Sequence, residues 1–395
     1  MPERWQSLWL LLLLAAAAAG GQGETAAPTG SDGRPGLNLG ALIGGESGAG
    51  ADGQAGYAVA DIPRVFDFPA DHGPHPAFRS EWWYLVSHLE AADGRDYGVQ
   101  FTLFRQALAP LVGPDTAASR WRTRQVWMAH VAVSGPDGVH RADERFSRDA
   151  LGLAGVRAEP FAAWLEDWRL ESVHPGQMFP LRLIAGVDDA VNSFEVELEF
   201  DGARGPILQG DQGLSRKSEG AGNASYYYSY TRMDARGRIR LDGDEVAVEG
   251  LGWMDREWST SVLDPGQVGW DWFALHLDDG RDLMVFQIRR EDGSIDGASG
   301  GVVVAEDGAS QTLTGADFDL EPLGSWRDET GAAWPVSWRL AVPSLGIRGR
   351  VEARHPDQLN RLALRYWEGR VCLDGPVPGC GYLEMTGYTA EASKM

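Results

Sequence analysis

Cysteine is scarce in this sequence: only Cys372 and Cys380 occur among 395 residues. Two isolated cysteines rarely hold a metal, because a structural zinc ion usually takes about four ligands. The segment between them, LDGPVPG, is rich in glycine and proline and contains an Asp-Gly pair, which is typical of a turn. We therefore expect a disulfide that clamps a hairpin, provided that the chain enters an oxidising compartment.

Basic side chains are also in short supply. The chain has 35 Lys and Arg against 57 Asp and Glu, a formal net charge of −22. Nucleic acids and anionic membranes attract proteins through clusters of positive charge, so this balance argues against both as partners. It fits a soluble protein that works outside the cytoplasm.

The apolar run at the N-terminus is too short to span a bilayer, which takes about 20 residues. It extends from Leu8 to Ala19, follows Arg4 and is followed by small residues. This is the pattern of a secretory signal peptide, here residues 1–23, and it predicts a periplasmic or secreted protein. A retained N-terminal anchor is the alternative. Residues 24–60 are rich in Gly, Ala, Ser and Asp, and we predict that they form a disordered linker.

Motifs for nucleotide or cofactor binding do not occur in the contexts that would support them. A G-x-S-x-G match at Gly297–Gly301 is followed by a strand and a turn rather than a helix. We interpret it as a glycine-rich loop, not as a nucleophile elbow. His72 and His75 could bind a metal together with Asp71, but the neighbouring prolines favour a rigid, hydrogen-bonded loop. We expect neither a metal nor a cofactor.

Alternation of apolar and polar residues dominates the rest of the chain. In Asn192–Phe200, three glutamates alternate with apolar side chains, which indicates a half-buried antiparallel strand. Similar strands are predicted at Glu81–Glu90, Tyr97–Gln106, Gln125–Ser134, Ser225–Met233, Glu245–Leu251, Asp271–Leu277, Leu283–Arg290, Val336–Val342, Leu362–Val371 and Gly381–Tyr388. Asp-Gly turn signals separate many of them. The pattern predicts an all-β protein made of antiparallel barrels or sandwiches.

A faint internal repeat divides the chain into two parts. EWWYLVSHLEAADGRDYGVQFTLFR in the first half and WDWFALHLDDGRDLMVFQIRR in the second share an aromatic pair, an apolar strand, a DGRD turn and a strand ending in arginine. In this interpretation Trp83-Tyr84 corresponds to Trp272-Phe273. The similarity favours a duplication, although hairpins also resemble one another by chance. We predict an N-terminal domain at residues 61–238 and a C-terminal domain at residues 239–395.

Several sequence strings, in the order in which they occur along the chain, resemble those of the AttH family. This family also contains bacterial carotenoid 1,2-hydratases, and its members are often labelled predicted secreted hydrolases. The strings span most of the chain: FPADHGPHPAFRSEWWYL (Phe68–Leu85), QFTLFR (Gln100–Arg105), MAHVAV (Met128–Val133), LQGDQGLSRK (Leu208–Lys217), NASYYYSYTR (Asn223–Arg232), GLGWMDREWS (Gly250–Ser259), GWDWFALHLDDGRDLM (Gly269–Met284), RYWEG (Arg365–Gly369) and GYLEMTGY (Gly381–Tyr388). The resemblance implies two tandem lipocalin-like barrels of the calycin type. It also implies a cavity for an apolar small molecule.

Asp255 is the first candidate for a catalytic residue. In the carotenoid hydratase branch, an acid in a Gly-x-Gly-Tyr-x-Asp string is thought to protonate the substrate alkene. The matching string here, Gly250 to Asp255, keeps the acid but has Trp253 in place of tyrosine. A His and a Trp found upstream in that branch are matched here by Tyr226 and Tyr228. The proton donor is therefore retained, while the carotenoid reaction itself is in doubt. The alternative is a structural pair of Asp255 with Arg256.

Other aromatic and polar residues are candidates for lining the cavity. Tryptophan, of which the chain has 16, suits both cores and ligand sites. The candidates are Tyr226, Tyr228, Trp253, Trp258, Glu257, Glu81, Trp83 and His130. For Trp83, closing the base of a barrel is the structural alternative, and for His130 it is a hydrogen-bonded core position. Glu257 could order the water that adds to the substrate.

Two functional hypotheses remain open. The first is an enzyme that hydrates or isomerises a C=C bond of an isoprenoid, polyene or other apolar substrate, with Asp255 as general acid. The second is a non-catalytic carrier of a lipid or metabolite outside the cytoplasm, which works with an ABC-type transporter. A structural or adhesive role has little support in the sequence.

Overall fold

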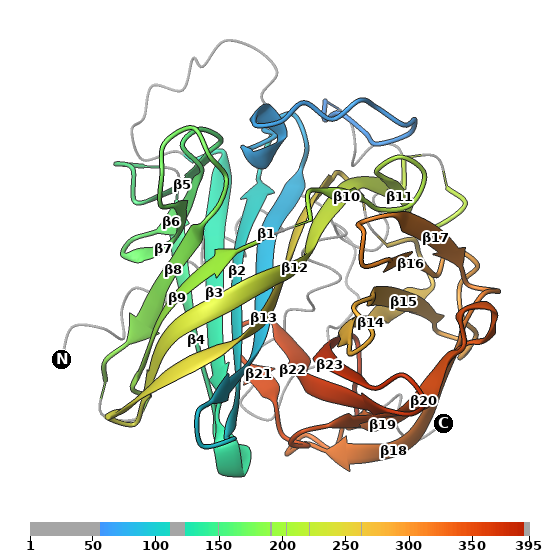
Figure 1. Ribbon diagram of the computed structural model, residues 1–395. Coiled ribbons are helices and arrows are strands. Elements are labelled where there is room, and N and C mark those ends of the chain that lie inside the picture. The colour runs from blue at the N-terminus through green and yellow to red at the C-terminus, as the bar shows by residue number, and fades with distance from the viewer. Residues whose placement is uncertain are drawn as a thin grey trace. The chain divides into compact units, whose positions relative to one another are not determined.

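The computed structural model describes residues 56–110, 123–148, 150–189, 192–202, 204–220, 222–261 and 263–390. The predicted signal peptide, and the predicted linker as far as residue 55, lie outside these ranges. The described chain is almost entirely antiparallel β-structure, as predicted (Figure 1). Among the described residues, no helix has the length and hydropathy needed to cross a membrane.

The first sheet is a near-complete barrel. Within the described residues its 13 strands follow the order β4-β3-β2-β1-β13-β12-β9-β8-β7-β6-β5, with β10 and β11 paired to β12. The strands are β1 (Ser80–Ala91), β2 (Asp96–Ala107), β3 (Gln125–Ser134), β4 (His140–Arg148), β5 (Ala154–Arg157), β6 (Ala162–Leu165), β7 (Trp168–Ser172), β8 (Leu181–Val187), β9 (Phe194–Asp201), β10 (Ile207–Leu208), β11 (Leu214–Arg216), β12 (Ala224–Leu241) and β13 (Asp244–Ser259). Two short 3-10 helices accompany them, η3 (Ala70–His72) and η4 (Pro136–Gly138).

The second sheet is a half-barrel of 10 strands in the described residues, in the order β17-β16-β15-β14-β23-β22-β20-β19-β18, with β21 paired to β22. Its elements are β14 (Gln267–Leu277), β15 (Asp282–Arg290), β16 (Gly300–Val304), β17 (Ser310–Thr314), β18 (Asp319–Arg327), β19 (Ala333–Val342), the 3-10 helix η5 (Pro343–Leu345), β20 (Ile347–Ala353), β21 (Leu359–Arg361), β22 (Arg365–Asp374) and β23 (Gly379–Met385). The two sheets together confirm the predicted tandem lipocalin-like fold.

Apolar side chains on alternate positions form a separate core inside each sheet. In β9, for example, Phe194, Val196, Leu198 and Phe200 are buried in the first core, while the intervening glutamates point outward. A third apolar cluster joins the outer face of the first sheet to the second sheet. The strands β1, β12 and β13 are therefore buried on both faces along much of their length.

The two sheets repeat one strand order. In each, the first four strands run outward from the first, and the last strand pairs with the first: β1 with β13, and β14 with β23. The change from one sheet to the other comes between Ser259 and Gln267. The expected domain boundary at residues 238 and 239 falls inside β12, which pairs with β13 along most of its length.

Residues on the first strand of each sheet contact each other directly. His88 of β1 and His276 of β14 form a hydrogen bond of 3.0 Å and are 188 residues apart in sequence. Tyr84 and Trp272, separated by the same interval, pack edge to face with ring centroids 5.4 Å apart. These contacting residues are not counterparts in the repeat, because the shared DGRD turns, with Gly94 matching Gly280, place Tyr84 at the position of Trp270. Trp83 faces the first core, on the other side of β1 from Tyr84.

Candidate functional site

The facing surfaces of the two sheets line a partly open cavity of about 80 Å³. A single water needs roughly 10–15 Å³ measured in the same way, so the space is larger than a hydration site. Eight aromatic side chains line it: Trp82, Tyr84, Phe104, Tyr227, Trp270, Trp272, Phe286 and Tyr366. Its ionisable lining consists of three acids, Asp255, Glu257 and Glu384, and one base, Lys217. The wall is therefore aromatic and acidic.

Asp255 lies on β13 with its side chain directed at the cavity, because odd-numbered residues of this strand face the second sheet. Three donors hold its carboxyl group. Trp253 Nε1 donates to Oδ1 at 2.7 Å, Ser229 Oγ donates to the same oxygen at 2.5 Å, and Tyr227 OH donates to Oδ2 at 2.5 Å. The carboxyl group is thus fixed in position by its own strand and by the neighbouring β12.

The protonation of Asp255 follows from its surroundings. Burial raises the pKa of this carboxyl from 3.8 to about 7, even though the three hydrogen bonds lower it. The effect of desolvation is the largest because Asp255 is only 3% exposed. None of the described residues that shift this pKa carries a positive charge that would stabilise the carboxylate. A carboxyl with this pKa can both donate and accept a proton near neutral pH.

Glu384 provides a second acid, from the other sheet. In strand register Asp255 is opposite Tyr84 and Glu384 is opposite Trp272, and these two aromatic rings pack edge to face. Glu384 accepts a hydrogen bond of 2.6 Å from Trp270 Nε1. Burial raises its pKa to about 7, and the negative charge of Asp255 adds to the effect.

Glu368 of β22 lies opposite Glu384 of β23 and is buried, whereas Glu384 is half-buried. Burial, reinforced by the charge of Glu384, raises its pKa well above the usual value. The Tyr84 hydroxyl interacts with this carboxyl, but neither group makes a hydrogen bond of ordinary geometry. The second sheet therefore contributes two acids that burial favours in the neutral form.

Glu257, two residues after Asp255 on the same face of β13, has a different environment. It forms an ion pair with Lys217, Nζ to Oε1 3.2 Å, and accepts a hydrogen bond from Ser225. The Lys217 ammonium group also lies over two cavity rings, 5.2 Å from the centroid of Tyr227 and 4.7 Å from that of Phe286.

Comparison with known proteins identifies the family. A family model described as AttH-like matches residues 59–388. The chain belongs to the AttH-like family. This confirms the resemblance inferred from the sequence strings.

Solved structures share the fold of this AttH-like chain. An AttH candidate from Nitrosomonas europaea is 32% identical, with a TM-score of 0.73, and the match covers 83% of this chain and 99% of that one. Kievitone hydratase from Nectria haematococca is 14% identical, with a TM-score of 0.60, and the match covers 85% of this chain and 98% of that one. The second similarity is one of fold alone. No curated protein sequence matches the chain significantly.

Five of the residues proposed from the sequence lie on the opposite face of the sheet from this AttH-like cavity. Their side chains point into the first barrel: Glu81, Trp83, Tyr226, Tyr228 and Trp258. On a strand, neighbours point to opposite faces, so Tyr227 rather than Tyr226 or Tyr228 reaches Asp255. Trp253 faces the second sheet, where it donates to Asp255 without lining the cavity.

Glu81 belongs to a buried ionic cluster inside the first barrel. It pairs with Arg105 and with Arg256, whose guanidinium lies 3.8 Å above the Trp83 ring. Burial alone would raise the pKa of Glu81, but the two guanidinium groups outweigh it and hold the pKa well below its usual value. His75 contributes its backbone N–H to the same carboxylate, at 2.9 Å. Arg256 therefore pairs with Glu81, on the face opposite Asp255.

The two remaining histidine candidates are bound by hydrogen bonds. His130 Nδ1 lies 2.9 Å from the hydroxyl of Tyr366, a cavity residue that also accepts a hydrogen bond of 2.6 Å from Gln100. His130 thus supports the cavity wall from behind. His72 lies next to the first core, with Nδ1 2.7 Å from Tyr228 OH.

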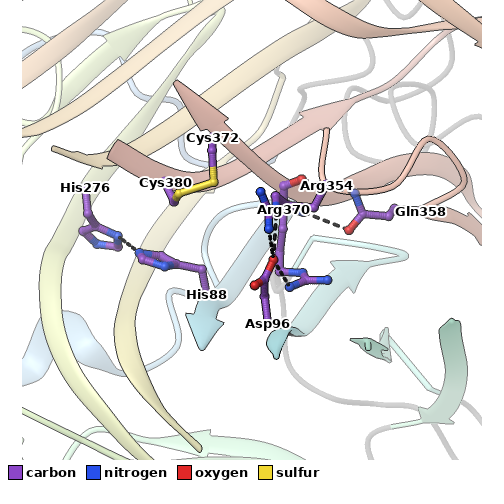
Figure 2. Close-up of a disulfide and its surroundings, with 8 residues drawn as sticks. All are labelled: His88, Asp96, His276, Arg354, Gln358, Arg370, Cys372 and Cys380. Atoms are coloured by element: carbon purple, nitrogen blue, oxygen red, sulfur yellow. Dashed lines mark hydrogen bonds and ion pairs between the residues drawn. A yellow bond between two sulfur atoms is a disulfide. The ribbon is translucent and has the colours of Figure 1, made fainter. Parts of the chain in front are cut away.

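The two cysteines lie opposite each other on β22 and β23 and form a disulfide with an S–S distance of 2.09 Å. Figure 2 shows this disulfide near the His88–His276 pair and near Asp96, which pairs with Arg354 and Arg370. Glu368 and Glu384 are also opposite each other on these two strands, four positions further along. The disulfide therefore ties together the two strands that carry the second pair of acids.

Tyr227, Trp272 and Glu384 were not among the site residues expected from the sequence. Glu384 lies in the string GYLEMTGY, where its alternation with apolar residues was read only as a strand. Glu384 has no distinguishing local signal, because its alternation with apolar residues is the same as that of the outward-facing glutamates of β9.

Proposed function

We propose that this protein binds an apolar small molecule in the cavity between its two sheets, and that Asp255 protonates a C=C bond of that molecule. The observation that carries the proposal is a buried carboxyl with a pKa of about 7 in the wall of an aromatic cavity. A general acid is most effective when its pKa lies near the working pH.

The proposed reaction is a hydration or an isomerisation. The Asp255 carboxyl gives its proton to one alkene carbon, the π bond breaks, and the other carbon becomes a carbocation. The faces of Trp272 and Tyr84 stabilise this cation. Water then adds to it and returns a proton to Asp255, with Glu257 placed to orient the water. In an isomerisation, the cation instead loses a different proton to the Asp255 carboxylate, and the electrons of that C–H bond form the new double bond.

Two further facts support this reaction class. The chain belongs to the AttH-like family, and a hydratase, kievitone hydratase, has the same fold. The three groups that bind Asp255 also keep the carboxylate that remains after proton transfer hydrogen-bonded in a site with little access to water.

The test begins with the protein's own ligand. We would purify the mature protein from its native host, extract any bound small molecule and identify it by mass spectrometry. That molecule is then incubated with the protein in D₂O. Turnover through Asp255 places deuterium on a carbon atom, so the product formed by the wild-type protein gains mass. The Asp255→Asn variant should form no deuterated product. The control variant Asp279→Asn, at an exposed position, should behave as wild type. Equal turnover by Asp255→Asn would refute the assignment.

A carrier is the second candidate, and one observation favours it. Both carboxyl oxygens of Asp255 already accept hydrogen bonds, and these favour the ionised form that cannot donate a proton. A carrier would hold the same class of ligand outside the cytoplasm and pass it to or from an ABC-type transporter. After incubation of a carrier in D₂O, mass spectrometry would find the ligand unchanged and without deuterium on carbon. The Asp255→Asn variant of a carrier would still bind the ligand.

A further inference from the structure

We propose that the cavity selects an apolar organic cation, a ligand whose apolar body carries a quaternary or protonated amine. This inference rests on the proposed binding cavity but does not depend on catalysis there. It names the charge of the preferred ligand, which neither the family nor the fold indicates.

The charge balance of the cavity wall is the first argument. Asp255, Glu257 and Glu384 line the cavity, and the one basic residue that lines it, Lys217, is already paired with Glu257. Two acids therefore face the cavity without a cationic partner among its lining residues. When they are ionised, a bound cation would supply the missing partner in a site with little water, where charge interactions are strong.

The aromatic wall is the second argument. A ring face attracts a cation within about 6 Å of its centroid, and a set of such faces is the usual cage for quaternary ammonium ligands. The protein already uses two of these rings in this way, because the Lys217 ammonium group lies over Tyr227 and Phe286. Trp82, Trp270 and Trp272 line the same space.

The incomplete hydrogen bonding of a buried hydroxyl is the third argument. The Tyr84 hydroxyl lines the cavity, and within the described residues it interacts with the Glu368 carboxyl but makes no hydrogen bond of ordinary geometry. A buried hydroxyl that is poorly satisfied is costly, and a ligand in the cavity would complete its hydrogen bonding. The hydroxyl oxygen can accept a hydrogen bond from a protonated amine, which an uncharged hydrocarbon cannot donate.

The experiment compares two probes of the same shape. Trimethylphenylammonium and tert-butylbenzene differ in the replacement of a cationic nitrogen by a carbon atom. Their binding to the mature wild-type protein, with its disulfide intact, is followed by quenching of tryptophan fluorescence and by calorimetry at pH 8.5 and pH 5.5. We expect the ammonium probe to bind at least about tenfold more tightly at pH 8.5. The preference falls at pH 5.5, because Asp255 and Glu384 take up protons.

Variants locate the effect. Asp255→Asn and Glu384→Gln each reduce the preference for the ammonium probe, whereas Asp279→Asn, an exposed acid, leaves it unchanged. Circular dichroism confirms that each variant is folded. Equal affinities for the two probes at pH 8.5 would overturn the inference while leaving an apolar cavity in place. Binding of neither probe would overturn this inference and the proposed binding cavity together.

Discussion

The protonation state of Asp255 makes the stability of the protein depend on pH in a direction opposite to that of an ordinary surface acid. Burial raises the pKa of this carboxyl from 3.8 to about 7 in the folded protein. Between those two values the folded state keeps a proton that the unfolded state releases. The free energy of unfolding therefore falls as the pH rises from about 4 to 7. A difference of about three pKa units corresponds to about 4 kcal/mol.

Asp255→Asn removes this dependence. The amide keeps an oxygen for Trp253 and Ser229, and its NH₂ group can donate to the Tyr227 hydroxyl, so the fold is retained. We expect the stability of the variant relative to wild type to rise by about 4 kcal/mol between pH 4 and 7.5, and then to level off. Urea unfolding curves of both proteins across this range measure the difference.

Glu384→Gln serves as a comparison for that experiment. Because burial raises the pKa of Glu384 from 4.5 to about 7, this variant should show the same trend with a smaller rise, about 3 kcal/mol. Asp279→Asn should show no such rise. A difference between Asp255→Asn and wild type that stays constant from pH 4 to 8 would mean that Asp255 is ionised throughout, and the general-acid argument would fail.

Three more substitutions examine other parts of the structure. Glu81→Gln leaves two buried guanidinium groups without their carboxylate and should destabilise the fold by about 3–5 kcal/mol in urea unfolding; a loss below about 1 kcal/mol would contradict the buried ion pairs. Tyr227→Phe removes a donor that lowers the pKa of Asp255, so infrared spectroscopy of the protonated carboxyl should show that pKa moving above 7; a downward shift would contradict the hydrogen bond. Cys372→Ser opens a short disulfide loop and should lower the free energy of unfolding by about 2–3 kcal/mol in urea unfolding. An unchanged free energy of unfolding would mean that the thiols are unpaired in the purified protein.

The strand β9 could be predicted because one of its faces is polar. In β9 the glutamates at alternate positions mark the outer face, and the predicted strand differs from the observed one by two residues or fewer at either end. The strands β4 and β18 were not predicted, because their side chains are mostly exposed or half-buried and show no regular alternation of a buried and an exposed face. They hold their place through backbone pairing with β3 and β19, which leaves little trace in local sequence.

The site was predicted only in part, for a related reason. Asp255 was found from the family string, not from periodicity. On β12 the tyrosines 226, 227 and 228 are all buried, because one face meets the first core and the other meets the second sheet. Alternation then identifies two faces but cannot tell which of them lines the cavity. That information lies in the contact between the sheets, which also brings Asp255 and Glu384 to the wall of the same cavity.

The contacts of His88 with His276 and of Tyr84 with Trp272 have a consequence for how ligand binding is lost on unfolding. Each contact joins a strand of the first sheet to a strand of the second, and residues of both sheets line the cavity. Each sheet nevertheless has an apolar core of its own. A partly unfolded state in which the sheets have separated should therefore lose its ligand while it still contains native strands.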